Sequence, residues 1–404
     1  MSVARRVTPL ILLSLAAAGA APAPGAPREV RGLWVVRTAL ASPASVSEMV
    51  TAAGGAGVNT LLVQVRGRGD AYYASRHEPR APALAGQPAS FDPLAQVLRE
   101  AHAAGLAVHA WVNVNLVADA GWLPSDPRHL VNRHPEWLMV PLELSASIGD
   151  PRGARFVRTL ASWTRSQPGG VEGLFLSPAP EGAADHLAGV VQDLVSRYAV
   201  DGVHFDYLRY PGASFDYSRA ALRAFEHEAA RGLSGQERAE LARRQRANPL
   251  IWTQRFPQRW DAFRRDRMTA LLQRLAGVVR RDRPKAVVSA AVFPEPQTAA
   301  SVKFQDWPRW AAAGIVDVAC PMTYAVDLAT FRQQVDAARG AARGTPLWAG
   351  IGAYRLSADD AARQIREARA LGVDGVLLFS YDSLVNPARG AETLSRIGAQ
   401  AFGQ

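Results

Sequence analysis

The amino-acid sequence predicts an α/β protein built as a (β/α)8 TIM barrel, with long insertions after strands three and four. Three observations lead to this prediction: about eight short apolar runs recur along the chain, amphipathic stretches separate them, and a glycine junction repeats between the two. The alternative is a doubly wound open sheet, but no G-x-G-x-x-G fingerprint follows the first apolar run. We therefore favour the closed barrel.

The glycine junction ends an amphipathic stretch and opens the next apolar run. Its glycines are Gly57, Gly105, Gly314 and Gly372, and residues 198–202 carry a shifted fifth copy. Glycine just past a helix end adopts the left-handed conformation without a Cβ clash, so the chain can turn directly into a strand. The repeat is typical of alternating helices and strands.

The apolar runs are nearly continuous in Val, Leu, Ile and Ala, as expected for parallel strands covered on both faces. The predicted strands are residues 32–36, 61–65, 107–114, 203–207, 286–293, 316–322, 347–351 and 376–381. The predicted helices are residues 46–56, 93–104, 184–198, 260–281, 331–339 and 358–371.

Two stretches, residues 115–183 and 211–259, are too long for ordinary connections. The second holds a charged helix around residues 234–246. Long loops after the carboxyl ends of barrel strands are where barrel enzymes build substrate clefts. We expect both insertions to shape such a cleft.

The net charge of +10 arises from 46 Lys and Arg against 36 Asp and Glu. The basic residues are almost all Arg in a chain rich in Ala, Gly and Pro, a bias that a GC-rich genome produces whatever the function. Lys and Arg form no block of five or more, and no stacking aromatic motif lies among them. A solvated basic surface therefore explains the charge better than nucleic-acid binding does.

The N-terminus predicts export. Arg5 and Arg6 precede an apolar run over residues 10–18, and small residues and prolines follow it. This pattern indicates a secretory signal peptide over residues 1–26 and a mature barrel over residues 27–404 in the periplasm or outside the cell. The apolar run is too short to remain as a membrane anchor. Cys320 is the single cysteine, so the fold does not depend on an internal disulfide.

The densest polar cluster of the chain is residues 201–211, DGVHFDYLRYP. Two-residue alternation puts His204 and Asp206 on one face of the fourth strand, which is the interior of a barrel. Asp206 then lies at the carboxyl end of that strand, where barrel active sites are built. Arg209 and Tyr210 follow it and could hold it ionised or position a sugar. The alternative is a buried aspartate that caps the next loop and pairs with Arg209.

Polar and aromatic residues end other predicted strands as well. Together with the cluster above, the candidate substrate-binding residues are Arg66, Asp70, Tyr72, His109, Trp111, Asn113, His204, Arg209, Tyr210, Tyr324, Trp348, Tyr381 and Asp382. Each alone is more often packing or a loop contact. Because the carboxyl ends of all barrel strands meet at one end, they predict a cleft with carboxylates, amides and ring faces, which suits a sugar.

Glycoside hydrolysis needs one carboxyl group as the acid and a second as base or nucleophile. Asp206 and Glu295 are the predicted pair, with Asp382 and Asp70 as alternatives, and Glu295 could equally be a solvated turn between two prolines. The eight histidines form no H-x-H or H-E-x-x-H pattern, and no G-x-S-x-G elbow occurs. We expect neither a metal ion nor an organic cofactor.

Five ordered motifs closely resemble the bacterial glycosyl-hydrolase-like family ten. They occupy residues 63–72, 91–102, 109–113, 134–137 and 201–211, so the resemblance extends over most of the mature chain. It implies an exported barrel glycosidase associated with peptidoglycan glycan strands that have lost their peptides. It also implies cleft positions for Arg66, Asp70, His109, Asn113, Asp206 and Arg209.

The chain departs from the family pattern at two places. Leu176-Ser177-Pro178 stands where the family usually has Leu-Asn-Pro, and Phe205-Asp206-Tyr207 stands where it often has Phe-Asp-Asp. One carboxylate beside Asp206 is therefore missing, which leaves the second catalytic group open.

The sequence thus predicts a glycosidase whose partner is a cell-envelope polysaccharide. Two alternatives remain: a catalytically inactive barrel that binds glycan or scaffolds other proteins, and a hydrolase of a secreted exopolysaccharide. For the latter, partly deacetylated poly-N-acetylglucosamine is cationic and would fit a carboxylate-rich cleft.

Overall fold

A computed structural model describes residues 29–167, 169–386 and 392–403. Eight parallel strands close a barrel in the order β1-β10-β9-β8-β7-β6-β3-β2, which confirms the predicted fold. The barrel strands are β1 (Val30–Val35), β2 (Thr60–Arg66), β3 (Ala107–Asn113), β6 (Gly202–Asp206), β7 (Val287–Val292), β8 (Val318–Thr323), β9 (Trp348–Ile351) and β10 (Gly375–Phe379). Each overlaps one of the eight predicted strands.

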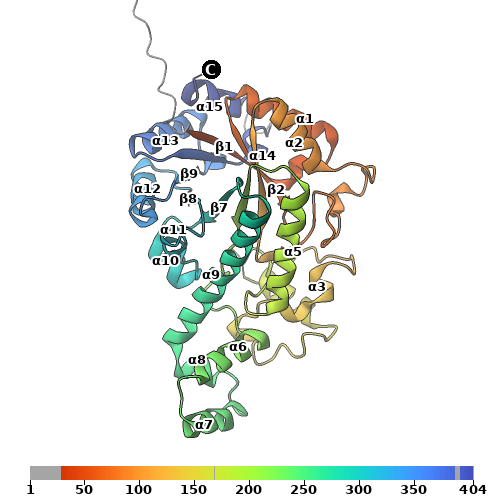
Figure 1. The fold of residues 1–404 in the computed structure, drawn as a ribbon, viewed down its shortest axis with the longest axis vertical. Coiled ribbons are helices and arrows are strands. Elements are labelled where there is room, and N and C mark those ends of the chain that lie inside the picture. The colour runs from red at the N-terminus through yellow and green to blue at the C-terminus, as the bar shows by residue number, and fades with distance from the viewer. Residues whose placement is uncertain (1–28, 168, 387–391, 404) are drawn as a thin grey trace, which may run out of the picture.

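Helices surround the barrel (Figure 1). Those that match predicted helices are α1 (Pro43–Gly55), α2 (Pro93–Ala103), α5 (Glu181–Arg197), α7 (Gly235–Gln245), α9 (Pro257–Asp282), α12 (Leu328–Ala342) and α13 (Ala358–Ala370). The sequence did not predict α3 (Leu130–Arg133), α4 (Phe156–Arg165), α6 (Arg219–Ala230), α8 (Ile251–Arg255), α10 (Pro296–Val302), α11 (Trp307–Ala312), α14 (Tyr381–Leu384) and α15 (Thr393–Ala401). Short 3-10 turns are η1 (Arg37–Leu40), η2 (Pro82–Leu84), η3 (Pro135–Trp137), η4 (Leu142–Leu144) and η5 (Ala353–Arg355).

Local sequence signals explain where these helices begin and end. Ser42 and Asp92 accept hydrogen bonds from first-turn backbone amides of α1 and α2, and a proline follows each of them. Gly57 and Gly105 lie just past the same two helices with φ of 72° and 73°, a conformation that side chains other than glycine rarely adopt. The repeated junction is therefore a helix C-cap that opens a buried strand.

Large rings fill the barrel interior beside glycines. A Cβ atom on Gly202 would lie 2.5 Å from the ring of His109, and one on Gly350 would lie 2.8 Å from the ring of Trp34. The interior apolar cluster consists of Trp34, Leu62, Trp111, Val318, Cys320, Trp348 and Leu377. The interior of the barrel is therefore a packed core and not an open channel.

The two insertions follow the third and fourth barrel strands, as predicted. The first carries a two-stranded antiparallel sheet of β4 (Leu116–Ala118) and β5 (Leu174–Phe175). The second forms a lobe of α6, α7 and α8 at the far end of the long helix α9 (Figure 1). This lobe has its own apolar core, made by Ala221, Phe225, Ala229, Leu241, Ile251, Trp252, Trp260 and Phe263.

The predicted signal peptide over residues 1–26 lies outside the described residues. Across the part of the chain that the structure describes, no helix has both the length and the apolar character that crossing a membrane requires.

Candidate active site

A cavity of about 310 Å³ opens at the carboxyl end of the barrel strands. It is lined by Trp34, Val36, Arg37, Gln64, Arg68, Trp111, Asn113, Asp206, Tyr207, Arg209, Ala291, Met322, Tyr324 and Phe379. Five of the predicted site residues are among them: Trp111, Asn113, Asp206, Arg209 and Tyr324.

Asp206 is the last residue of β6 and lies in register with Asn113 of β3. Its Oδ1 accepts hydrogen bonds from the backbone N–H of Tyr207 at 2.5 Å and from Nη1 of Arg209 at 3.1 Å. Oδ2 has no hydrogen-bond partner among the described residues, which leaves this oxygen for a ligand. Burial raises the pKa of Asp206 more than the charge of Arg209 lowers it. The carboxyl group therefore keeps its proton to a higher pH than an ordinary aspartate does, which suits proton donation.

Arg209 links Asp206 to a second carboxylate. Its Nη2 lies 3.4 Å from Oε1 of Glu172, a residue of the first insertion. The guanidinium carbon lies 3.9 Å from the ring centroid of Tyr207 and 5.4 Å from that of Phe293, so two rings hold it in place. Tyr207 has a φ of 53°, in the left-handed region, and this turn brings Arg209 back over the end of its own strand. Glu172 itself is not among the residues that line the cavity.

Aromatic rings form much of the cavity wall. The ring centroid of Phe379 lies 5.9 Å from that of Trp34, 6.4 Å from that of Trp111 and 5.5 Å from that of Tyr324. The indole Nε1 of Trp111 is buried and has no hydrogen-bond partner among the described residues. A buried donor without a partner at a cavity wall indicates a place for a ligand oxygen.

The cavity lining holds three guanidinium groups, those of Arg37, Arg68 and Arg209, and one carboxyl group, that of Asp206. Nη1 of Arg37 donates to Oε1 of Gln64 at 2.9 Å, and Nε2 of Gln64 lies 3.4 Å from Oδ1 of Asn113. Nε of Arg68 is buried without a partner in the described part of the chain. Burial, followed by the nearby charge of Arg37, lowers the pKa of Arg68. The cavity is therefore lined by an excess of positive charge.

Three predicted binding residues, His109, His204 and Trp348, do not line the cavity; they lie in the barrel interior. Trp34 donates its indole N–H to Nε2 of His204 at 3.1 Å, so Nδ1 carries the proton and donates to Oγ of Ser289 at 2.9 Å. Burial lowers the pKa of His204 to about 3 and that of His109 to about 4. Both imidazoles are neutral near pH 7; His204 is hydrogen-bonded to Trp34, which lines the cavity, and His109 packs against Trp348.

Arg66 does not line the cavity either. Its guanidinium binds Glu78 twice, at 2.5 and 2.8 Å, and also donates to the carbonyl oxygens of Asn113 and Val114. The prediction placed Arg66 in the cleft because it ends strand two, but a register shift between Gln64 and Arg66 on β2 redirects the end of that strand. Arg66 is thus committed to a buried ion pair.

The other predicted residues of this region belong to loop and core packing. Tyr72 is buried, and burial raises its pKa to about 12. Oδ1 of Asp70 accepts the backbone N–H of Arg68 at 2.9 Å, and its side chain lines a separate surface cavity with Trp122 and His129.

Tyr210, Tyr381 and Asp382 do not line the cavity either. Tyr210 is buried with its ring centroid 5.2 Å from that of Phe304, and Tyr381 is buried at the start of α14. Oδ2 of Asp382 accepts the backbone N–H of Val36 at 3.1 Å, and Oδ1 accepts the hydroxyl of Thr38. Asp382 ties α14 to the end of β1.

Glu295 does not line the cavity with Asp206. It is exposed at the start of α10, where its Oε1 accepts a hydrogen bond from Nε2 of Gln334 at 2.8 Å. It lies three residues past Val292, the last residue of β7, and immediately before α10. The described residues offer no contact that would pair it with Asp206, whereas Glu172 shares a guanidinium with that residue.

The sequence analysis did not select Trp34, Arg37, Gln64, Arg68 and Phe379 as site residues. Trp34, Gln64 and Phe379 could have been found from alternation, because they share the inward face of their strands. Arg37 and Arg68 follow the ends of strands one and two, and their position was the available signal. Arg66 gave the same signal, but its side chain is buried in the ion pair with Glu78 and does not line the cavity.

Comparisons with known proteins agree on the family and the fold. A family model described as glycosyl hydrolase-like 10 matches residues 29–351. Glycosyl hydrolase DigH of Escherichia coli (strain K12) is 30% identical over 163 residues, which are 39% of this chain and 33% of DigH. Glycosyl hydrolase YngK of Bacillus subtilis (strain 168) is 26% identical over 162 residues, which are 38% of this chain and 26% of YngK. These matches span about a third or less of the length of the curated relatives.

Solved structures with a similar fold include glycoside hydrolases. The PgaB (BpsB) glycoside hydrolase domain from Bordetella bronchiseptica has a TM-score of 0.62 at 17% identity and covers 91% of this chain and 98% of that one. A β-galactosidase from Bacillus circulans has a TM-score of 0.63 at 13% identity and covers 93% of this chain and 56% of that one. At such identities the likeness shows the barrel fold alone.

Proposed function

We propose that this chain, which belongs to the glycosyl hydrolase-like 10 family, hydrolyses glycosidic bonds in a polysaccharide of the bacterial cell envelope. The observation that carries the proposal is Asp206. It ends a barrel strand at the floor of a cavity walled by aromatic rings, with Oδ2 unpartnered among the described residues and its pKa raised by burial. A protonated carboxyl group in such a place can donate to the oxygen of a scissile glycosidic bond.

Glu172 is the proposed second carboxylate. Both Asp206 and Glu172 contact the same guanidinium, so the contacting oxygens lie no more than about 9 Å apart, which is compatible with the separations that glycosidases use. Glu172 is partly exposed, which gives it access to water. In the proposed reaction Asp206 gives its proton to the departing sugar oxygen, while Glu172 takes a proton from a water molecule that attacks the anomeric carbon from the opposite face. Arg209 holds the two carboxyl groups in place relative to each other.

The charge of the cavity favours an anionic glycan. Arg37, Arg68 and Arg209 outnumber the carboxyl group of Asp206, and the nearby charge of Arg37 adds to the burial that lowers the pKa of Arg68. An anion between such groups relieves their repulsion. Peptidoglycan strands without peptides carry a free lactyl carboxylate on every second sugar, so we propose these strands as the substrate. A cationic, partly deacetylated poly-N-acetylglucosamine would be repelled by the same guanidinium groups.

The test is digestion of peptide-free peptidoglycan strands by the purified protein, with products identified by mass spectrometry. Asp206→Asn and Glu172→Gln each remove an ionisable group with little change in shape, and we expect each to lower the rate by roughly 10²-fold or more. Glu295→Gln is the matched control and should keep near-full activity. No sugar release by the wild type, with glycan binding intact, would favour the inactive glycan-binding barrel. Release from poly-N-acetylglucosamine alone would favour the exopolysaccharide alternative.

A further inference from the structure

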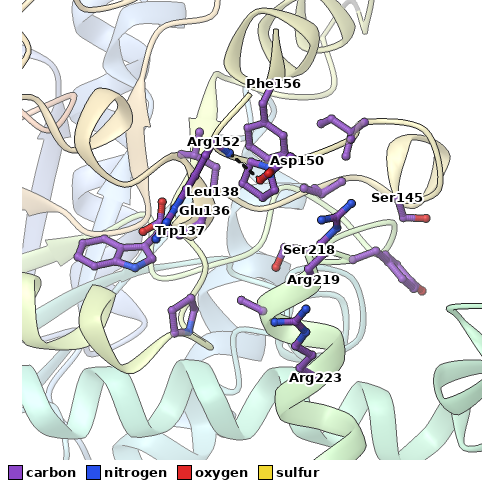
Figure 2. Close-up of a pocket in the computed structure, with 17 residues that line it drawn as sticks. Glu136, Trp137, Leu138, Ser145, Asp150, Arg152, Phe156, Ser218, Arg219 and Arg223 are labelled. Atoms are coloured by element: carbon purple, nitrogen blue, oxygen red, sulfur yellow. Dashed lines mark hydrogen bonds between the residues drawn. The ribbon is translucent and has the colours of Figure 1, made fainter. Parts of the chain in front are cut away.

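A second cavity, of about 440 Å³, lies outside the barrel mouth. One side is the loop around residues 136–156 of the first insertion, and the other is the start of helix α6 in the second insertion. Figure 2 shows Arg219 and Arg223 on the helix and Arg152 with Asp150 on the opposing loop. We call this cavity the insertion groove.

The walls of the insertion groove are fixed by buried hydrogen bonds. Oδ1 of Asp216 accepts the backbone N–H groups of Val140 at 2.9 Å and Ser218 at 2.8 Å, and Oδ2 accepts the hydroxyl of Ser218 at 3.1 Å. The backbone N–H of Tyr217 donates to the carbonyl oxygen of Val140 at 2.7 Å. The two insertions are therefore joined across the base of the groove before any ligand arrives.

The groove carries unpaired positive charge. The guanidinium groups of Arg152, Arg219 and Arg223 line it, and none makes an ion pair or side-chain hydrogen bond with another described residue. The lining also holds two carboxylates, so its guanidinium groups exceed its carboxylates by one. Oε1 of Glu136 lies 3.2 Å from Nδ1 of His134, and Oδ1 of Asp150 accepts the backbone N–H of Arg152 at 3.0 Å. Three such guanidinium groups in one cavity form a site for carboxylate or phosphate groups.

Two aromatic residues, Trp137 and Tyr217, accompany this charge in the lining. The ring of Trp137 stacks on His134 with centroids 3.8 Å apart and an interplanar angle of 7°, which holds the indole at the edge of the groove. Tyr217 is a half-buried lining residue on the helix side. Flat rings beside cationic groups suit a sugar polymer that bears acidic substituents.

We propose that the insertion groove binds a carboxylate-bearing stretch of the polysaccharide at a distance from the bond that is cleaved. The identity of the ligand rests on the proposed function, because guanidinium groups accept phosphate as readily as carboxylate. The groove and the barrel mouth share a building element, since the β4–β5 insertion supplies both the groove loop and Glu172. Both also carry an excess of guanidinium groups. A long acidic strand can engage both places, whereas a short fragment can engage only the mouth.

The test is a binding measurement in the Asp206→Asn background, where a bound strand stays intact. The variant Arg219→Glu/Arg223→Glu reverses the charge of the helix side, and Arg238→Glu/Arg244→Glu makes the same charge change on α7 as a matched control. We expect the groove variant to bind long peptide-free strands roughly tenfold more weakly, the loss expected for exposed charge contacts, and to bind a tetrasaccharide unchanged. The control should match the parent for both ligands. Converting the strand carboxylates to amides should weaken binding by the parent at least to the level of the groove variant, because the barrel mouth loses its carboxylate contacts as well.

Equal affinity of groove variant and control for long strands would overturn the proposal. So would undiminished binding of the amidated strands by the parent, since carboxylates would then play no part. Direct binding of inorganic polyphosphate by the parent, lost in the groove variant, together with no binding of the glycan would make the ligand a phosphate polymer and also overturn it. Arg219→Gln/Arg223→Gln, with its thermal unfolding measured, shows whether a loss reflects charge and not folding. Because binding needs no cleavage, absent hydrolysis counts against the proposed function and leaves this test intact.

Discussion

Arg209 holds Oδ1 of Asp206 through Nη1 at 3.1 Å and leaves Oδ2 of the same carboxyl group without a partner among the described residues. The buried carboxyl group is therefore fixed in orientation but not neutralised on the side that meets a ligand. Burial raises the pKa of Asp206, and Arg209 opposes that rise. The contact with Arg209 thus sets both the orientation of the Asp206 carboxyl group and the pH range in which that group keeps its proton.

Replacing Arg209 by Gln should move the alkaline limb of the pH profile of kcat/KM to higher pH. The acid works while protonated, so activity is lost as pH rises through the pKa of Asp206. Without the cation that lowers it, this pKa rises further. The rate at the optimum should fall by roughly 10²-fold, because the link to Glu172 is lost as well. Rates on peptide-free glycan fragments over a range of pH provide the measurement. Arg274→Gln, which removes an exposed ion pair with Asp185, is the control. A limb that stays in place or moves to lower pH would contradict the assignment of Asp206 as acid.

Glu78→Gln should make stability depend less on pH in the acid range. Burial alone would raise the pKa of Glu78, but Arg66 and His186 outweigh it and hold the pKa at about 2, below the usual 4.5. The stabilisation from this ion pair is therefore present above about pH 4.5 and is lost as pH falls toward 2. At pH 7 the variant leaves a buried guanidinium unpaired, which should cost about 3–5 kcal/mol of unfolding free energy. Urea unfolding at pH 7 and pH 3 should show that the difference in unfolding free energy between variant and wild type is smaller at pH 3. A difference that is equal at both would refute this role.

Gly202→Ala should destabilise the barrel by about 1–3 kcal/mol. Its new Cβ would lie 2.5 Å from the ring of His109, and that ring packs against Trp348 with centroids 5.5 Å apart, so it has little room to move. Gly212→Ala is the matched control, because no heavy atom lies within 4 Å of the place that its new methyl group would take. Thermal unfolding compares the two. Equal stability of both variants would mean that the interior is looser than these contacts indicate.

The exported protein should begin at a residue between 19 and 27. The charged start, the short apolar run and the small residues after it are the signals that a signal peptidase uses. N-terminal sequencing of protein recovered from the envelope of a native host checks this. Full-length protein that retains Met1 and stays in the cytoplasm would argue against export.

The sequence by itself determined the barrel and the position of its principal carboxyl group. Strand and helix periodicity are local, and the glycine junctions mark each passage from helix to strand, so eight strands could be located without long-range information. Asp206 followed from the same reasoning, because it ends a strand and shares the inward face with His204. Trp111 and Asn113 could be predicted on strand three for the same reason.

Only the tertiary structure decided which of the remaining polar residues meet at the cavity. Arg66 and Arg68 look alike in the sequence, but a register shift in β2 turns Arg66 into a buried pair with Glu78 while Arg68 reaches the cavity. Glu172 lies in the first insertion, whose irregular sequence has no periodicity that would indicate its position, and α5 separates it from Asp206 along the chain. The guanidinium of Arg209 nevertheless contacts both carboxylates. Contacts of this kind depend on how distant segments pack, and the energy of that packing is spread over the whole fold and not encoded in any one local pattern.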